Sequence, residues 1–128
     1  AAVFKLNKMS KKTLVLGASP NPARYSYLAV KKLQAYKHPV VAIGRRASSI
    51  DGTAVITGRP ELEKIDTVTL YLNPANQVPY YDYILSLKPK RIIFNPGTEN
   101  AQLAQMAAKQ GIEPVEACTL VMLGTGQY

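Results

Sequence analysis

The stretch Lys12-Thr-Leu-Val-Leu-Gly17-Ala18-Ser19-Pro20-Asn21-Pro22 decides the fold of this chain. Its apolar run is too short for a helix and stops at turn residues, so it predicts a short buried strand that ends at Gly17. Residues 18–22 then form a loop. Asn21 followed by Pro22 indicates a helix start, because asparagine caps free amides and proline suits the first helical position.

The same alternation of strand and helix continues along the chain. Apolar runs typical of strands lie at residues 39–43, 67–72, 91–94 and 112–118, with a shorter one at 54–56 after a turn at 50–52. Helical patterns lie at residues 23–36, 78–87 and 99–109, and residues 119–128 show no clear pattern. Short apolar strands alternating with helices are typical of a parallel sheet covered on both faces. The sequence therefore predicts an α/β fold, a single Rossmann-like doubly wound parallel sheet of about five strands with helices on both faces.

One domain is expected, because there is no internal repeat, low-complexity tract or linker. We assign it to residues 11–128 and expect residues 1–10 to be a flexible N-terminal extension. No apolar run approaches the ~18 residues of a membrane helix, and the N-terminal lysines precede no signal-like segment. Cys118 is the single cysteine and has no partner for an internal disulfide. These features favour a cytoplasmic protein without membrane contact.

The charge is distributed unevenly. The net charge is +8, and residues 1–50 contain ten Lys or Arg and no acidic residue. The rest of the chain, with six basic and eight acidic side chains, is close to neutral. A one-signed block of this length favours a phosphate-bearing partner, although a solvated basic face is also compatible with it. Nucleic acid is a less favoured partner, because the lysines are scattered and belong to no recognised reading motif.

A ligand is expected beyond the carboxyl ends of the strands, where loops meet at the point of reversed strand order. The first such loop runs into a helix N-terminus, whose free amides and dipole favour a phosphate. A dinucleotide fingerprint would require glycines at 17, 19 and 22, whereas this chain has Gly17, Ser19 and Pro22. The loop therefore predicts phosphate binding without a dinucleotide fingerprint, and a plain strand–helix turn remains the alternative.

The second loop narrows the type of ligand. Nicotinamide dinucleotide sites commonly have an acidic residue here for the ribose hydroxyl, whereas this strand ends in Ile43-Gly44-Arg45-Arg46. Two arginines favour a phosphate on the ribose, as in coenzyme A or in the phosphorylated nicotinamide dinucleotide. Arg24 adds a further positive charge nearby if its side chain turns the same way. The alternative is a pair of solvated arginines.

With these residues the chain resembles the coenzyme A-binding domain family, which includes small stand-alone bacterial proteins and the N-terminal domain of the succinyl-coenzyme A synthetase α subunit. The resemblance covers residues 12–118. It rests on the segments Gly17-Ala-Ser-Pro-Asn-Pro-Ala-Arg-Tyr-Ser26, Ala42-Ile-Gly-Arg-Arg46 with Ile50-Asp-Gly52, Tyr71-Leu-Asn-Pro74 with Val78-Pro79, and Phe94-Asn-Pro-Gly97 with Asn100. This chain differs from many members at the end of the second strand, where they have a proline-containing segment.

The resemblance implies coenzyme A as the ligand. It implies that the Gly17–Ser19 loop holds the pyrophosphate, that Arg45 or Arg46 faces the 3′-phosphate, and that Asn73, Pro74 and Val78 line the adenine or pantetheine path. The expected binding residues are Gly17, Ala18, Ser19, Asn21, Pro22, Arg24, Ile43, Gly44, Arg45, Arg46, Asn73, Pro74, Val78, Asn95 and Gly97. The synthetase reaction does not carry over, because its catalytic histidine belongs to a second domain.

No catalytic residues are expected. His38 is the single histidine and suits a surface turn, and no nucleophile elbow, P-loop or metal-ligand cluster is present. Glu99 and Glu116 have no evident partner. Cys118 is either a buried structural residue or close to the thiol end of a bound coenzyme A.

The sequence favours a non-catalytic module that binds coenzyme A or an acyl-coenzyme A. The alternatives are a regulatory protein or a reductase that uses the phosphorylated nicotinamide dinucleotide, for which Tyr25 and Tyr27 are poorly placed as proton donors. A homodimer is compatible with the sequence, since small domains of this class often pair.

Overall fold

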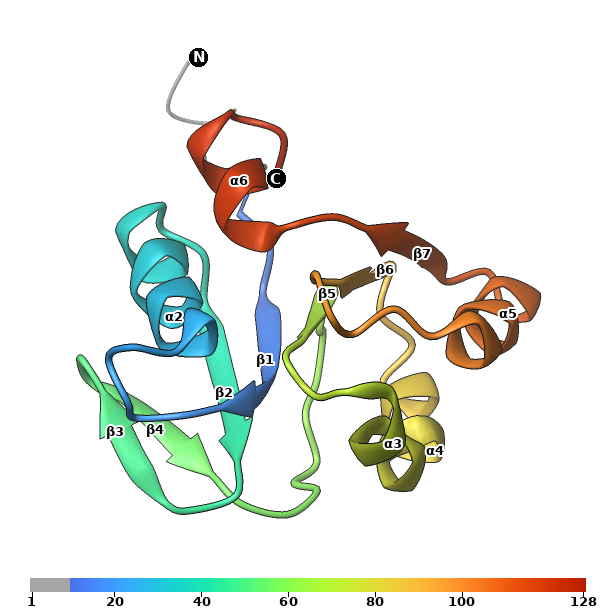
Figure 1. The fold of residues 1–128 in the computed structure, drawn as a ribbon, viewed down its shortest axis with the longest axis horizontal. Helices are drawn as coiled ribbons and strands as arrows, with labels where there is room; N and C mark the ends of the chain where they lie inside the picture. Colours follow the sequence, from blue (N-terminus) through green and yellow to red (C-terminus); the bar gives the residue numbers. More distant parts are fainter. Residues whose placement is uncertain (1–9) are drawn as a thin grey trace.

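The computed structural model describes residues 10–128 and contains a seven-stranded sheet with helices on both sides (Figure 1). In chain order the elements are β1 (Thr13–Ala18), α2 (Tyr25–Ala35), β2 (Val40–Gly44), β3 (Ser48–Ile50), β4 (Thr53–Ile56), β5 (Thr67–Leu70), α3 (Pro74–Gln77), the 3-10 turn η1 (Val78–Tyr80), α4 (Tyr81–Ser86), β6 (Arg91–Phe94), α5 (Ala101–Lys109), β7 (Glu113–Glu116) and α6 (Thr119–Gly124).

The sheet reverses its order between β1 and β5. Its strand order is β3-β4-β2-β1-β5-β6-β7, and β1 pairs in parallel with both β2 and β5. The chain passes from β1 to β2 on one side and from β5 through β6 to β7 on the other. The predicted α/β class is thus confirmed. The predicted number of strands is too low, because the hairpin of β3 and β4 extends the sheet with an antiparallel edge strand.

Alternating side chains of β1 separate two cores. Leu14 and Leu16 pack with Ile84 of α4 and Leu103 of α5 on one face of the sheet. On the other face, Val15 belongs to a cluster that includes Val30 and Leu33 of α2 and Leu123 of α6. Figure 1 shows the same division, with α2 and α6 on one side and α3, α4 and α5 on the other. Each buried Leu or Val stabilises the fold by about 1.5–3 kcal/mol, so packing on both faces of the sheet holds β1 in place.

The predicted helix 78–87 is two short elements, η1 and α4, and the short helix α3 directly precedes them. Asn73 caps α3 by accepting a hydrogen bond from the Asn76 amide at 2.9 Å, with Pro74 at the first helical position. Pro79 has no N–H to donate, and the chain narrows to a 3-10 turn around it before α4 begins at Tyr81. This segment contributes Asn73, Asn76 and Tyr80 to the cavity described below.

Three further boundaries differ from prediction. The first helix begins at Tyr25 rather than residue 23, and the last strand is limited to residues 113–116. Residues 119–124, which showed no pattern in the sequence, form α6. The expected extension at residues 1–10 lies outside the described residues except for Ser10. Between residues 10 and 128, no helix has the length and apolar character needed to cross a membrane.

Candidate functional site

The end of β1 requires a glycine. Gly17 has a φ of +98°, and a Cβ atom there would lie 3.0 Å from the main-chain carbonyl carbon of Tyr71. The glycine therefore lets β1 pass close against the end of β5, at the point where the strand order reverses.

The loop between β1 and α2 is held by its own hydrogen bonds. The Ser19 amide donates to Ser26 Oγ at 3.2 Å, and the Asn21 amide donates to Ser19 Oγ at 3.1 Å. Asn21 Oδ1 accepts from the Ala23 amide at 3.0 Å, so this side chain closes a turn and does not cap α2, contrary to prediction. No side chain of the described residues caps α2. Its first-turn amides consequently remain available to an anion.

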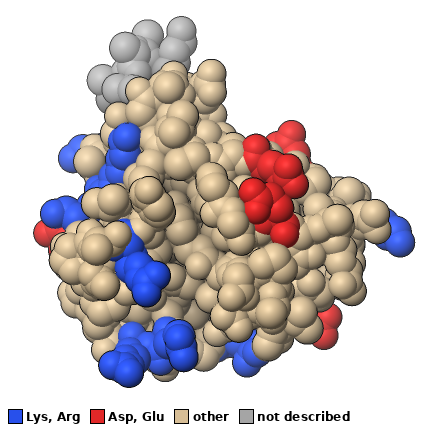
Figure 2. All heavy atoms as spheres, in the orientation of Figure 1, with Lys and Arg blue, Asp and Glu red and all other residues tan. Residues whose placement is uncertain are grey.

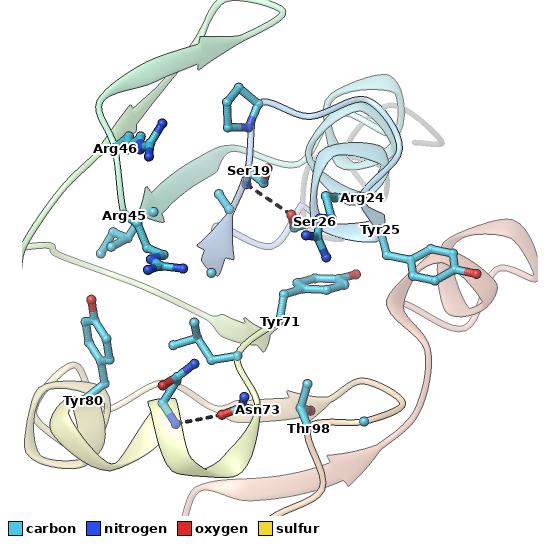
Figure 3. Close-up of a pocket in the computed structure, with 18 of the residues that line it drawn as sticks. Ser19, Arg24, Tyr25, Ser26, Arg45, Arg46, Tyr71, Asn73, Tyr80 and Thr98 are labelled. Carbon is cyan, nitrogen blue, oxygen red and sulfur yellow. Dashed lines mark hydrogen bonds between the residues drawn. The ribbon is translucent and has the colours of Figure 1, made fainter.

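Gly44 brings the end of β2 against the end of β1. A Cβ atom at position 44 would lie 2.3 Å from the Ala18 carbonyl oxygen and 2.9 Å from Val55 Cγ1. Any larger residue would push β2 away from β1. The tight contact places Arg45 and Arg46, which follow directly, at the rim of the space above the sheet (Figure 3).

These loops enclose a cavity of about 910 Å³ over the β1–β5 switch point. This volume lies within the range of about 300–1,000 Å³ that small-molecule and cofactor sites occupy. Among residues 10–128, three arginines and no acidic residue line the cavity. In Figure 3, Arg45, Arg46 and Tyr80 lie on the left, whereas Arg24, Ser26 and Tyr25 lie on the right. Positive charge therefore borders the cavity on both of these sides.

The charge of the wider surface agrees with that of the cavity. Figure 2 shows Lys and Arg gathered on the left and lower parts of this face, over α2 and the β2–β4 region. Acidic side chains gather at the upper right, over the region of β7. An anion that approaches this face is attracted toward the cavity side, with a range set by ionic strength.

A buried polar network fixes the opposite wall. Gln77 is fully buried, and its Nε2 donates to the carbonyl oxygens of Leu72 at 2.9 Å and Thr98 at 2.8 Å. Its Oε1 accepts from Asn100 Nδ2 at 2.9 Å. Asn100 Nδ2 also donates to Tyr81 Oη at 2.8 Å. Because the bonds to Thr98 and Asn100 link the segment after β5 to the one after β6, the network holds the two segments in one arrangement.

The structure brings most of the predicted binding residues together. Those that line the cavity are Gly17, Ala18, Ser19, Arg24, Ile43, Gly44, Arg45, Arg46, Asn73 and Gly97. The predicted residues that do not line it are Asn21, Pro22, Pro74, Val78 and Asn95. Val78 is 55% exposed and turns outward from η1. The cavity is thus built largely from the ends of β1 and β2 and the segments that follow them.

Asn95 turns into the protein instead of toward the cavity. Only 3% of it is exposed, and its Nδ2 donates to Thr69 Oγ1 at 2.7 Å and to the Leu70 carbonyl oxygen at 2.8 Å. Its Oδ1 accepts from the Thr119 amide at 2.9 Å. With its amide engaged in this way, Asn95 ties β5, β6 and the start of α6 together.

Sequence reasoning missed several residues that line the cavity: Pro20, Tyr25, Ser26, Tyr71, Leu72, Asn76, Tyr80, Pro96 and Thr98. Most of them adjoin predicted residues, so their position next to a strand end could have identified them from the sequence. The Tyr71 hydroxyl is buried and makes no hydrogen bond within the described chain. Burial raises the Tyr71 pKa, and nearby Thr69 and Thr119 hydroxyls oppose this shift only in part.

The residues with the greatest catalytic potential lie elsewhere. Glu99 Oε1 accepts from the Gly97 amide at 2.9 Å and so supports the loop after β6. Cys118 is half-buried at the N-cap of α6 and does not line the cavity. His38 accepts a hydrogen bond on Nδ1 from the Lys11 amide at 2.9 Å and packs on Tyr128. Within residues 10–128, no group of three His, Cys, Asp or Glu could hold a metal ion.

Comparison with known proteins agrees with this geometry. The family model described as a CoA binding domain matches residues 11–124. A crystal structure of an uncharacterized protein is 53% identical, covers 93% of this chain and 98% of its own, and superposes with a TM-score of 0.91. No protein with a curated description matches this chain.

More distant structures share the fold. A hypothetical protein from Pyrococcus horikoshii is 21% identical with a TM-score of 0.83, covering 97% of this chain and 89% of its own. A protein from Thermus thermophilus is 16% identical with a TM-score of 0.82, covering 99% and 97%. At such identities the likeness concerns the fold alone.

Proposed function

This chain belongs to the CoA-binding domain family, and on that premise we propose that it binds coenzyme A or an acyl-coenzyme A in the cavity over the β1–β5 switch point. It acts as a nucleotide-binding module that catalyses no reaction of its own. The observation that carries this proposal is the charge of the cavity, where Arg24, Arg45 and Arg46 meet no acidic residue among the described residues.

The charge of the cavity suits that of the ligand. Coenzyme A has a pyrophosphate near its middle, a 3′-phosphate at its adenosine end and an uncharged pantetheine arm. The first-turn amides of α2 and the Ser19 hydroxyl suit the pyrophosphate. Arg45 and Arg46, on the left in Figure 3, suit the 3′-phosphate through charge-assisted hydrogen bonds. The pantetheine arm then extends toward Tyr71 and Thr98.

The side chains that line the cavity support the proposal that the chain catalyses no reaction. Within residues 10–128 they include no His, Cys, Asp, Glu or Lys. Acid–base catalysis needs a group that titrates within reach of the substrate, and nucleophilic catalysis needs an activated nucleophile. Ser19 Oγ is engaged with the Asn21 amide and has no basic partner among these residues.

The cytoplasmic location and the homodimer compatible with the sequence stay predictions.

The phosphorylated nicotinamide dinucleotide is the nearest competing ligand, because its 2′-phosphate presents a similar charge to the same arginines. A thermal-shift series separates the two. It compares coenzyme A, dephospho-coenzyme A and the nicotinamide dinucleotides with and without the 2′-phosphate. A ligand present at 100 times its dissociation constant stabilises the fold by about 2.7 kcal/mol.

We expect the largest shift with coenzyme A and a smaller one with dephospho-coenzyme A. Arg45→Ala and Arg46→Ala should reduce the shift with coenzyme A. Lys109→Ala is their control and should keep the wild-type shift, since it removes one positive charge from an exposed side chain of α5 outside the cavity. A shift with the phosphorylated nicotinamide dinucleotide alone would replace the proposal with the reductase alternative. No shift with any of the four ligands would refute it.

A further inference from the structure

Tyr80 lines the end of the cavity that holds Arg45 and Arg46. It is the last residue of η1 and is half-buried against the core cluster of α4 and α5. In Figure 3 its side chain stands at the left of the cavity, with its hydroxyl directed toward Arg45. An aromatic ring and a guanidinium from two separate loops thus occupy the same end of the site.

The Tyr80 ring is supported from outside the cavity. Arg59, in the connection between β4 and β5, places its guanidinium carbon 4.8 Å from the centroid of the ring. Arg59 Nη2 also donates to the Pro79 carbonyl oxygen at 2.8 Å, which ties the arginine to the turn that bears the tyrosine. Because Arg59 does not line the cavity, it covers a side of the ring that is turned away from it.

We propose that Tyr80, supported by Arg59, is the surface on which the adenine of the bound ligand stacks, while Arg45 contacts the phosphate on the same ribose. This inference rests on the proposed function and extends it to residues that sequence reasoning did not select. Adenine and the 3′-phosphate are attached to one ribose, so a site for both needs an aromatic surface close to a cation. Tyr80 and Arg45 meet that requirement.

The other two tyrosines that line the cavity do not combine an accessible ring with a nearby Arg45 or Arg46. Tyr71 packs into the core cluster beneath α2, with a buried hydroxyl. Tyr25 is 71% exposed and lies at the opposite end, beside Arg24. Neither shares an end of the cavity with Arg45 and Arg46. Adenine stacking therefore falls to Tyr80, and Arg59 acts as a positioning residue that restricts the motion of its ring.

Titration of coenzyme A and adenosine 3′,5′-bisphosphate tests the inference. The second ligand contains the adenosine end without the pantetheine arm. Tyr80→Leu should weaken both ligands by about 5- to 150-fold, the range expected for loss of base–aromatic stacking. Tyr80→Phe should bind like the wild type, and Arg59→Gln should lose about 2- to 5-fold. Tyr36→Leu, at an exposed tyrosine outside the cavity, is the matched control.

A second readout separates stacking from a general loss of structure. In proton NMR, the adenine H2 and H8 signals of bound adenosine 3′,5′-bisphosphate should move upfield through the ring current of Tyr80. That shift should persist in Tyr80→Phe and vanish in Tyr80→Leu. If the wild type binds coenzyme A and Tyr80→Leu binds both ligands within twofold of it, the stacking inference is wrong and the proposed function stands. If the wild type binds neither ligand, both are wrong.

Discussion

Gly44 lies so close to Ala18 that a Cβ atom at position 44 would come within 2.3 Å of the Ala18 carbonyl oxygen. This contact joins the carboxyl ends of β1 and β2, from which most of the predicted binding residues come. Relief of such a clash needs backbone movement, since the neighbouring atom is main chain and cannot rotate away.

Gly44→Ala should therefore lower the free energy of unfolding by about 1–3 kcal/mol. Urea denaturation followed by circular dichroism measures the change. Gly124→Ala is the matched control, because its Cβ would meet only the flexible end of Lys32. We expect the control to be neutral or slightly stabilising, as a Gly-to-Ala change in a helix usually is. Equal stability of Gly44→Ala and the wild type would contradict the close approach of the two strands.

Asn95 offers a test of a structural against a ligand-binding role. Asn95→Ala leaves the Thr119 amide and the Leu70 carbonyl oxygen without their side-chain partner. Each buried group left unsatisfied costs about 1–3 kcal/mol, so unfolding should become markedly easier. Asn21→Ala, at an exposed asparagine outside the cavity, should have a smaller effect. If Asn95→Ala kept wild-type stability but no longer bound coenzyme A, Asn95 would be a ligand-binding residue and not a structural one.

Two tyrosines should respond in opposite ways to loss of their hydroxyl. The Tyr71 hydroxyl is buried without a partner among the described residues, whereas Tyr83 Oη donates to the Pro60 carbonyl oxygen at 2.6 Å. Tyr71→Phe should leave stability unchanged or raise it, because it removes an uncompensated polar group from the interior. Tyr83→Phe should cost about 0.5–1.5 kcal/mol. Thermal unfolding of both variants checks this, and a larger loss at Tyr71 would show that its hydroxyl is bonded.

His38 should make stability dependent on pH. Burial lowers its pKa below the usual 6.5, and the neighbouring charges of Lys11 and Arg91 lower it further, whereas Asp66 opposes them. Its Nδ1 accepts the Lys11 amide proton and must be unprotonated to do so. The unfolded state therefore binds the proton more readily, and stability should fall as pH falls below about 6.5.

Urea denaturation between pH 5 and pH 8 measures this dependence, and the result is simple to assign because His38 is the single histidine of the chain. His38→Asn retains an acceptor without a titrating ring, so most of the slope between pH 6.5 and pH 5.5 should vanish. A slope unchanged by the substitution would assign the pH dependence to other groups.

The strands that border the cavity could be predicted because their signals are local. The runs at residues 14–16 and 40–43 are wholly apolar and are followed by glycines, so the strand ends and the basic residues after them were evident from spacing alone. The β3–β4 hairpin was missed as sheet because it lies at an edge, is short and buries only Ile50 and Val55 fully. Helix α6 was missed because few of its residues are buried, among them Thr119 and Leu123.

The other side of the cavity depends on the directions of side chains, which the spacing of residues in the sequence does not reveal. Asn95 and Gly97 follow the same strand, yet Asn95 turns inward to Thr69 whereas Gly97 borders the cavity. Tyr80 lies in a 3-10 turn that the sequence did not predict, and its side chain points toward Arg45. Asn21 satisfied every local rule for a helix cap but is used by the preceding turn. Such outcomes are decided by packing between loops that are distant in sequence.

The central claim is that the cavity binds coenzyme A and that its arginines recognise the 3′-phosphate. Isothermal titration of coenzyme A and dephospho-coenzyme A into the wild type, Arg45→Ala and Arg46→Ala tests it as a double-mutant cycle. We expect the wild type to prefer coenzyme A by about 10- to 100-fold, the range for a hydrogen bond to a charged group. At least one of the two variants should lose most of that preference. If the wild type bound both ligands equally, or if both variants kept the full preference, the claim would be contradicted.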